Sequence, residues 1–87
     1  MPEISRFKGI AIRMFFRGEH NPPHFHARYG SEKAVIAIKD LSILEGHLSP
    51  RAMGLVIEWA TLHKRELLND WVKAKQREPL FQIDPLK

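Results

Sequence analysis

Three histidines around a proline turn are the residues of this sequence best suited to do chemistry. They are His20, His24 and His26, in the run Glu-His-Asn-Pro-Pro-His-Phe-His. Residues i and i+2 of a β-strand point to the same side, with Cα atoms roughly 6.5–7 Å apart, so His24 and His26 can meet one ligand. Pro22 and Pro23 fix two φ angles and are expected to hold His20 close to this pair.

The histidine cluster has three interpretations. Three neutral imidazoles with an open coordination position suit a catalytic divalent metal such as zinc. Two imidazoles beside Arg28 and Lys33 suit acid–base cleavage of a phosphodiester without a metal, as in a phosphodiesterase or ribonuclease. In the third interpretation the histidines only build the turn and donate hydrogen bonds, and the protein is a non-catalytic interaction module. The residues alone leave all three open, and with them the question of whether the protein is an enzyme.

Length and composition indicate one small domain covering residues 1–87. The sequence is 44% hydrophobic and 28% charged, as expected for a globular protein. It has no cysteine, and a small domain without disulfides is typical of a reducing compartment, which predicts the cytoplasm. The first apolar run, residues 9–16, is too short to span a bilayer and is interrupted by Arg13. We therefore expect no membrane partner, and a homo-oligomer is left open.

Apolar and polar residues alternate in three segments, 9–17, 24–30 and 33–39, which predicts an antiparallel meander. Gly30-Ser31 suits a two-residue type II′ hairpin turn, because the glycine comes first. This turn sets Phe25 opposite Ile36 and Arg28 opposite Lys33. Residues 81–83 would add a short closing strand, giving three to four strands.

One face of the predicted sheet is basic. The chain has 14 Lys and Arg against 10 Asp and Glu, a net charge of +4, which permits nucleic acid as a partner. Arg28 and Lys33 repel one another across the hairpin, and an anionic ligand would relieve this cost. Tyr29 is a candidate for base stacking, but the register places it on the apolar side. The candidate nucleic-acid-binding residues are Arg13, Arg17, Arg28, Lys33 and Lys39, with Phe15 as a stacking group.

A helical segment from about 50 to 77 follows the strands. Ser49-Pro50 is typical of a helix start, with a capping side chain before proline at the first helical position. The apolar stripe up to His63 and the stripe beyond it differ in direction by roughly 80°. We therefore expect one long helix kinked near 63–66, or two helices, packed on the sheet in an α+β fold. The position of His63 on the inward stripe predicts a core residue.

The sequence resembles a small bacterial family catalogued as domain of unknown function 4160. The resemblance is carried by the opening Met-Pro-Glu-Ile-Ser-Arg-Phe, by His-Asn-Pro-Pro-His-Phe-His with Tyr29-Gly30 after it, and by Glu58-Trp59 with His63. It implies a component of a two-gene, toxin–antitoxin-like cassette, and no reaction. Our leading hypothesis is accordingly a toxin–antitoxin-like module that binds nucleic acid or a cognate small protein through the basic, histidine-bearing face.

Overall fold

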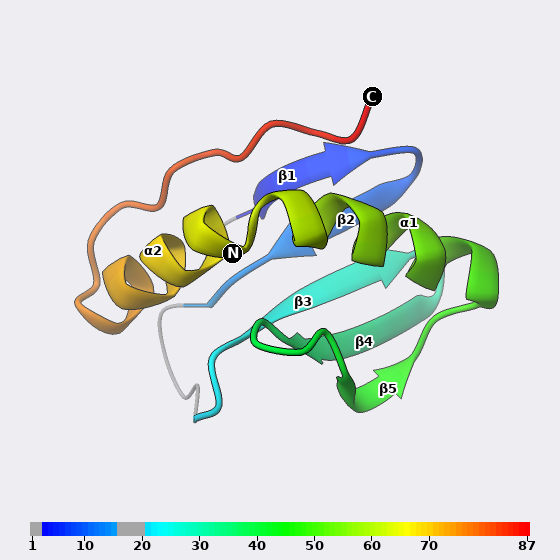
Figure 1. Cartoon of the computed structure of the whole chain (residues 1–87), viewed down its shortest axis with the longest axis horizontal. Coiled ribbons are helices and arrows are strands. Elements are labelled where there is room, and N and C mark those ends of the chain that lie inside the picture. Colours follow the sequence, from blue (N-terminus) through cyan, green and yellow to red (C-terminus); the bar gives the residue numbers. More distant parts are fainter. Residues whose placement is uncertain (1–2, 16–20) are drawn as a thin grey trace.

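A five-stranded antiparallel meander forms the body of the protein (Figure 1). The computed structural model describes residues 3–15 and 21–87. The strand order follows the sequence, and the strands are β1 (Glu3–Phe7), β2 (Ile10–Arg13), β3 (His24–Tyr29), β4 (Glu32–Ala37) and β5 (Ile43–His47). The predicted α+β class and meander are confirmed, whereas the predicted number of three to four strands is wrong.

Two tight turns set the register of the meander. Lys8 and Gly9, with φ of 48° and 82°, join β1 to β2 in the manner of a type I′ turn. Gly30, with φ of 61°, begins the turn between β3 and β4, as the type II′ prediction requires. Phe25 pairs with Ile36 and Arg28 with Lys33. The predicted register of this hairpin is therefore confirmed.

Two helices follow the sheet, α1 (Pro50–Leu62) and α2 (Lys64–Lys75). They are separated at His63, whose φ of −126° and ψ of 23° interrupt the helix. The predicted change of direction near 63–66 is confirmed, and the alternative of one continuous helix is wrong. The Ser49 side chain makes no capping hydrogen bond; the Ser49 backbone N–H instead donates to Glu32 Oε1 at 2.8 Å.

The helices cover one face of the sheet, and the core lies between the helices and this face (Figure 1). Trp59 of α1 is fully buried at its centre, with its ring 5.3 Å from that of Phe7 and 6.1 Å from that of Phe25. No helix in the described part of the chain has the length and apolar character needed to cross a bilayer. The apolar side of each alternating strand packs against the helices, and the other side of the sheet faces away from them.

The C-terminal segment, from Gln76 onward, runs without regular structure beside β1 (Figure 1). The Ile83 backbone N–H donates to the Ile4 carbonyl at 2.8 Å, and the Trp59 indole N–H donates to the Asp84 carbonyl at 2.8 Å. The prediction of a strand over residues 81–83 is therefore wrong. The segment nevertheless satisfies a backbone group of β1.

The two outer strands, β1 and β5, lack the regular apolar–polar alternation that predicts a strand. In β1 both Ile4 and Ser5 are buried, because the register shifts between Glu3 and Ser5 and breaks the alternation. In β5 the register shifts against β4, and Gly46 has a φ of 81°. In sequence, a segment that lacks alternation and contains a glycine has the pattern typical of a loop, so β5 was not predicted.

Gly46 and Gly54 give a matched pair of stability tests. A Cβ on Gly46 would lie 2.2 Å from the Lys33 carbonyl oxygen, and the positive φ adds strain. We expect Gly46→Ala to lower the free energy of unfolding by at least about 2 kcal/mol. Gly54 lies within α1 with open space at its Cβ position, so Gly54→Ala should raise it by about 0.4–1 kcal/mol. Urea denaturation measures both, and equal effects would contradict the structure.

Asp70 of α2 gives a pH-dependent test. Its side chain is 1% exposed; Oδ1 accepts the Phe81 N–H at 2.9 Å, and Oδ2 has no hydrogen-bond partner among the described residues. Burial raises the pKa of the Asp70 carboxyl above its usual 3.8, while the Phe81 N–H and Lys73 act to lower it. Above 3.8 the folded state then holds a proton that the unfolded state has lost, so this group's contribution to stability falls as pH rises.

Asp70→Asn retains an oxygen for the Phe81 N–H and cannot titrate. Relative to this variant, the wild-type free energy of unfolding should decline as pH rises from just below 3.8 through the raised pKa. Urea titrations of both proteins across this range measure the difference. A difference that is constant with pH, or that rises, would contradict the assignment.

Candidate functional site

The face of the sheet away from the helices, here called the open face, carries two rows of side chains that cross the strands. Successive cross-strand pairs define the first row as Arg6, Ala11, Arg28, Lys33 and His47. The second row, defined in the same way, is Glu3, Arg13, His26, Val35 and Glu45. Cations therefore concentrate at the centre of the open face.

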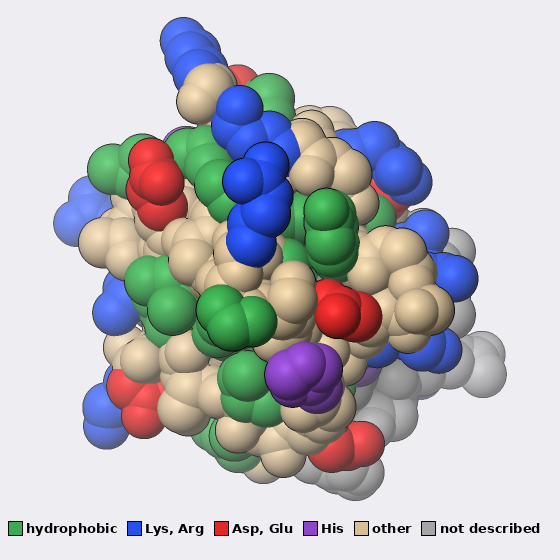
Figure 2. Space-filling model, turned by 90° about the vertical axis from the view of Figure 1, so that its right-hand side faces the viewer, with side chains coloured by type: hydrophobic (Ala, Val, Ile, Leu, Met, Phe, Trp, Pro, Cys, Tyr) green, Lys and Arg blue, Asp and Glu red, His purple; other side chains and the backbone are tan. Residues whose placement is uncertain are grey.

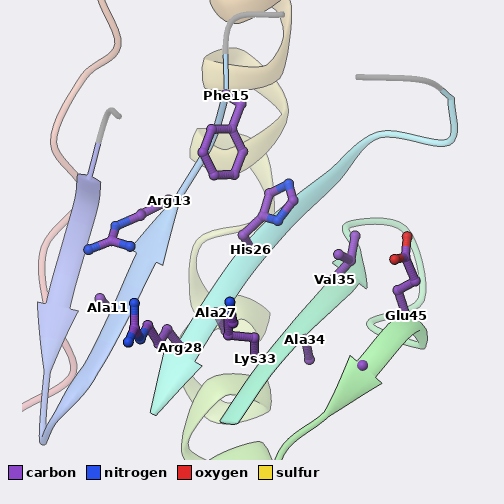
Figure 3. A pocket seen from close by; sticks show the side chains of 11 residues that line it. Ala11, Arg13, Phe15, His26, Ala27, Arg28, Lys33, Ala34, Val35 and Glu45 are labelled. Atoms are coloured by element: carbon purple, nitrogen blue, oxygen red, sulfur yellow. The ribbon is translucent and has the colours of Figure 1, made fainter. Parts of the chain in front are cut away.

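A hollow of about 360 Å³ lies over these rows (Figure 3). Strands β2 to β5 and the segment after β2 contribute its walls. The side chains there that can make polar or stacking contacts are Arg13, Phe15, His26, Arg28, Lys33 and Glu45. Ala11 and Val35 are small enough to leave space between the longer side chains.

A second hollow, of about 300 Å³, adjoins the first on the side of β1. The two share Ala11, Arg13 and Arg28, and the second adds Arg6. Together they form a track that crosses the sheet roughly perpendicular to the strands. Such a track suits an extended ligand better than a compact one.

The charges of the track are only partly compensated. Arg28 and Lys33 are directly opposite one another and exposed, and Arg28 Nε donates to the Gly30 carbonyl at 3.0 Å. Arg6 is neutralised by a two-point contact with Glu3, whose oxygens lie 2.7 and 3.1 Å from its nitrogens. The Arg28–Lys33 pair therefore places two exposed positive charges side by side on the open face, where they attract an anion.

Two rings stand together at one wall of the hollow. The rings of Phe15 and His26 meet edge to face, with centroids 4.3 Å apart and planes at 89° (Figure 3). Both side chains are half-buried, so each is held in place while part of it faces the hollow. A flat ring held in this way can stack on a nucleic-acid base.

His24 lies beside His26 but is buried outside the hollow. It is 7% exposed, and its ring centroid lies 5.0 Å from that of Trp71 on α2 and 5.5 Å from that of His26. Its Nδ1 lies 2.8 Å from the Pro22 carbonyl oxygen. Because a carbonyl can only accept, Nδ1 carries the proton, and in the neutral ring Nε2 carries the lone pair. The turn thus fixes the tautomer of His24, although His24 does not line the hollow.

The spacing of His24 and His26 bears on the metal prediction. Two imidazoles on one tetrahedral zinc have ring centroids roughly 5 Å apart, so the 5.5 Å between His24 and His26 is compatible with a shared ion. The described residues contain no group of three or more His, Cys, Asp or Glu side chains that could hold a metal. His20, the proposed third ligand, lies outside the described residues. Zinc binding stays a prediction.

Of the remaining predicted residues, Lys39, Tyr29 and His63 do not line the hollow. Arg17 lies outside the described residues, and Lys39 lies beyond the end of β4 in the turn before β5. Tyr29 is partly buried against the core, in keeping with its predicted side. The His63 ring lies 5.5 Å from that of Trp59 with the planes at 41°, and the side chain contacts Glu66, so His63 belongs to the helical side. It is half-buried and is not among the buried residues, so the prediction of a core residue is wrong.

Glu45 is the residue of the hollow that sequence reasoning missed. It lies on β5, which was not predicted, and it enters the second row through its pairing with Val35. The one available signal was its place two residues before His47, at strand spacing. Gly46, which lies between Glu45 and His47, is typical of a loop, so this spacing did not indicate a strand.

Basic charge alone would not have identified the open face. The side of the molecule in Figure 2 also carries Lys and Arg side chains, and acidic and hydrophobic side chains lie among them. What distinguishes the open face is the combination of adjoining hollows, directly opposed cations and two rings at one wall.

Comparison with known proteins gives one result. A family model described as "Domain of unknown function (DUF4160)" matches residues 9–72, most of the chain. The chain belongs to this family. No curated protein and no solved structure matched it. The match runs from the start of β2 to α2, so it includes all the polar and stacking side chains of the larger hollow in this DUF4160 protein.

The opposed cations make a prediction about stability without ligand. Lys33→Glu sets a negative charge opposite Arg28 and should raise the free energy of unfolding by about 0.2–1 kcal/mol at low ionic strength. Lys33→Gln, which removes repulsion without adding attraction, should give a smaller gain. Urea denaturation at low and high salt measures both, and the gain should fade as salt screens the charges. A Lys33→Glu variant less stable than the wild type at low salt would contradict the pairing.

Proposed function

We propose that this protein binds single-stranded nucleic acid along the track on the open face. The observation that carries the proposal is the pair Arg28 and Lys33, directly opposed and exposed in the hollow. Like charges facing one another cost stability in the free protein, and a phosphate between them turns this cost into attraction. Arg13, which lines both hollows, supplies a further cation.

A single strand is favoured over a duplex by the ring pair at the wall. Phe15 and His26 can stack only on a base that is not already stacked within a helix. An unpaired strand also follows an irregular track across a sheet more easily than a stiff duplex does. The backbone would contact the cations while one base lies against the rings.

The proposal extends to the setting of the protein. The resemblance to domain of unknown function 4160 implies a toxin–antitoxin-like cassette, and a nucleic-acid ligand for this member fits that setting. The absence of cysteine favours the cytoplasm, where nucleic acid is available. A cognate small protein as the ligand of the open face is the competing outcome of the test below.

Binding is tested with a labelled single-stranded 2′-O-methyl RNA oligonucleotide, which resists hydrolysis, by fluorescence anisotropy. The double variant Arg28→Ala with Lys33→Ala should bind at least about tenfold more weakly than the wild type. Loss of two phosphate contacts should also flatten the log–log salt dependence by about 1.4, at about 0.7 for each contact.

The control is the double variant Arg51→Ala with Arg65→Ala, which loses the same charge from exposed positions on the helices. It should bind close to wild-type strength. Affinity insensitive to salt, or an equal loss in both double variants, would contradict a nucleic-acid site on the open face and favour a protein partner.

A further inference from the structure

Glu45 is difficult to explain if the hollow only binds phosphate. Its carboxylate lies on the wall of a basic hollow, where it repels the backbone that the cations attract. The described residues place one carboxylate and one imidazole in this hollow, Glu45 and His26. One acidic and one imidazole group beside several cations are the components of acid–base phosphoryl transfer.

The two groups flank the centre of the hollow from opposite sides. His26 on β3 pairs with Val35 on β4, and Val35 pairs with Glu45 on β5. Two strand spacings separate their backbones by about 10 Å. Both side chains project from the same face, with the smaller Val35 between them (Figure 3). A phosphate placed over Val35 would therefore have a carboxylate on one side and an imidazole on the other.

We infer that this protein cleaves single-stranded RNA by acid–base catalysis, with Glu45 as base and His26 as acid. The inference rests on the proposed binding of nucleic acid by the open face. RNA is the suitable substrate because its 2′-hydroxyl is an internal nucleophile next to the phosphate, so the reaction needs only proton transfers and charge stabilisation.

The step balances without any further reactant. The Glu45 carboxylate takes the proton of the 2′-hydroxyl as O2′ attacks phosphorus and forms the O2′–P bond. The P–O5′ bond breaks, and the protonated His26 imidazole gives its proton to the departing O5′. The products are a 2′,3′-cyclic phosphate and a 5′-hydroxyl end. Arg28 and Lys33, which also line the hollow, stabilise the negative charge that develops on the phosphoryl oxygens.

The requirement for opposite sides decides among the histidines. In an in-line displacement the attacking and leaving oxygens lie on opposite sides of phosphorus, so the base and the acid must too. His24 does not line the hollow, and its Nδ1 contacts the Pro22 carbonyl. Of the two described residues in the histidine cluster, His26 is thus the one that meets the geometric requirement.

The test incubates the full chain with a single-stranded RNA of mixed sequence in the presence of EDTA and analyses the ends by mass spectrometry. The wild type should yield 2′,3′-cyclic phosphate and 5′-hydroxyl ends. His26→Gln and Glu45→Gln should each slow cleavage by about 100-fold or more. His63→Gln and Glu58→Gln, which change the same residue types on the helices and outside the hollow, should cleave at the wild-type rate.

Binding of 2′-O-methyl RNA, which lacks the nucleophile, separates the two proposals. Glu45→Gln should bind it at least as tightly as the wild type, because a repulsive charge is gone, while cleaving RNA far more slowly. A merely structural role for Glu45 would weaken binding and cleavage together. If the wild type binds but leaves RNA intact, or if both variants cleave at the wild-type rate, the catalytic inference is overturned. If the 2′-O-methyl RNA is not bound, the proposed function itself fails.

Discussion

Trp59 holds α1 and the C-terminal segment on one side of the sheet. Its indole is fully buried, packs on Phe7 of β1 and Phe25 of β3, and donates its N–H to the Asp84 carbonyl at 2.8 Å. An 87-residue chain can build about one such apolar layer. Once the helices lie on this side, the opposite face of the meander is left to polar side chains.

The same packing determines which polar side chains meet. With Phe25 and Ile36 paired in the core, period-two alternation sends His26, Arg28 and Lys33 to the open face. A slip of one residue would exchange the two faces, so the core and the hollow depend on a single register. Apolar packing on the other side of the same strands holds Arg28 and Lys33 opposite one another despite their repulsion.

The central part of this arrangement could be predicted from the sequence, and its edges could not. The Gly30-Ser31 turn and regular alternation gave the β3–β4 pairing and the cations facing each other across it. Both outer strands depart from alternation at register shifts, which are properties of a paired strand and leave no local pattern. Glu45 was missed for this reason. The burial of His24, beside His26 but outside the hollow, was missed because it depends on Trp71, a residue of α2 far along the chain.

The central claim is that ligand binding belongs to the sheet face opposite the helices, and amide chemical-shift mapping tests it most directly. Titrating isotope-labelled protein with a single-stranded 2′-O-methyl RNA oligonucleotide should shift amides of β2, β3 and β4, with the largest changes near His26, Arg28 and Lys33. The chemical shifts of amides along the outer surfaces of α1 and α2 should not change. Shifts confined to the helices, or their absence at saturating oligonucleotide, would contradict the account.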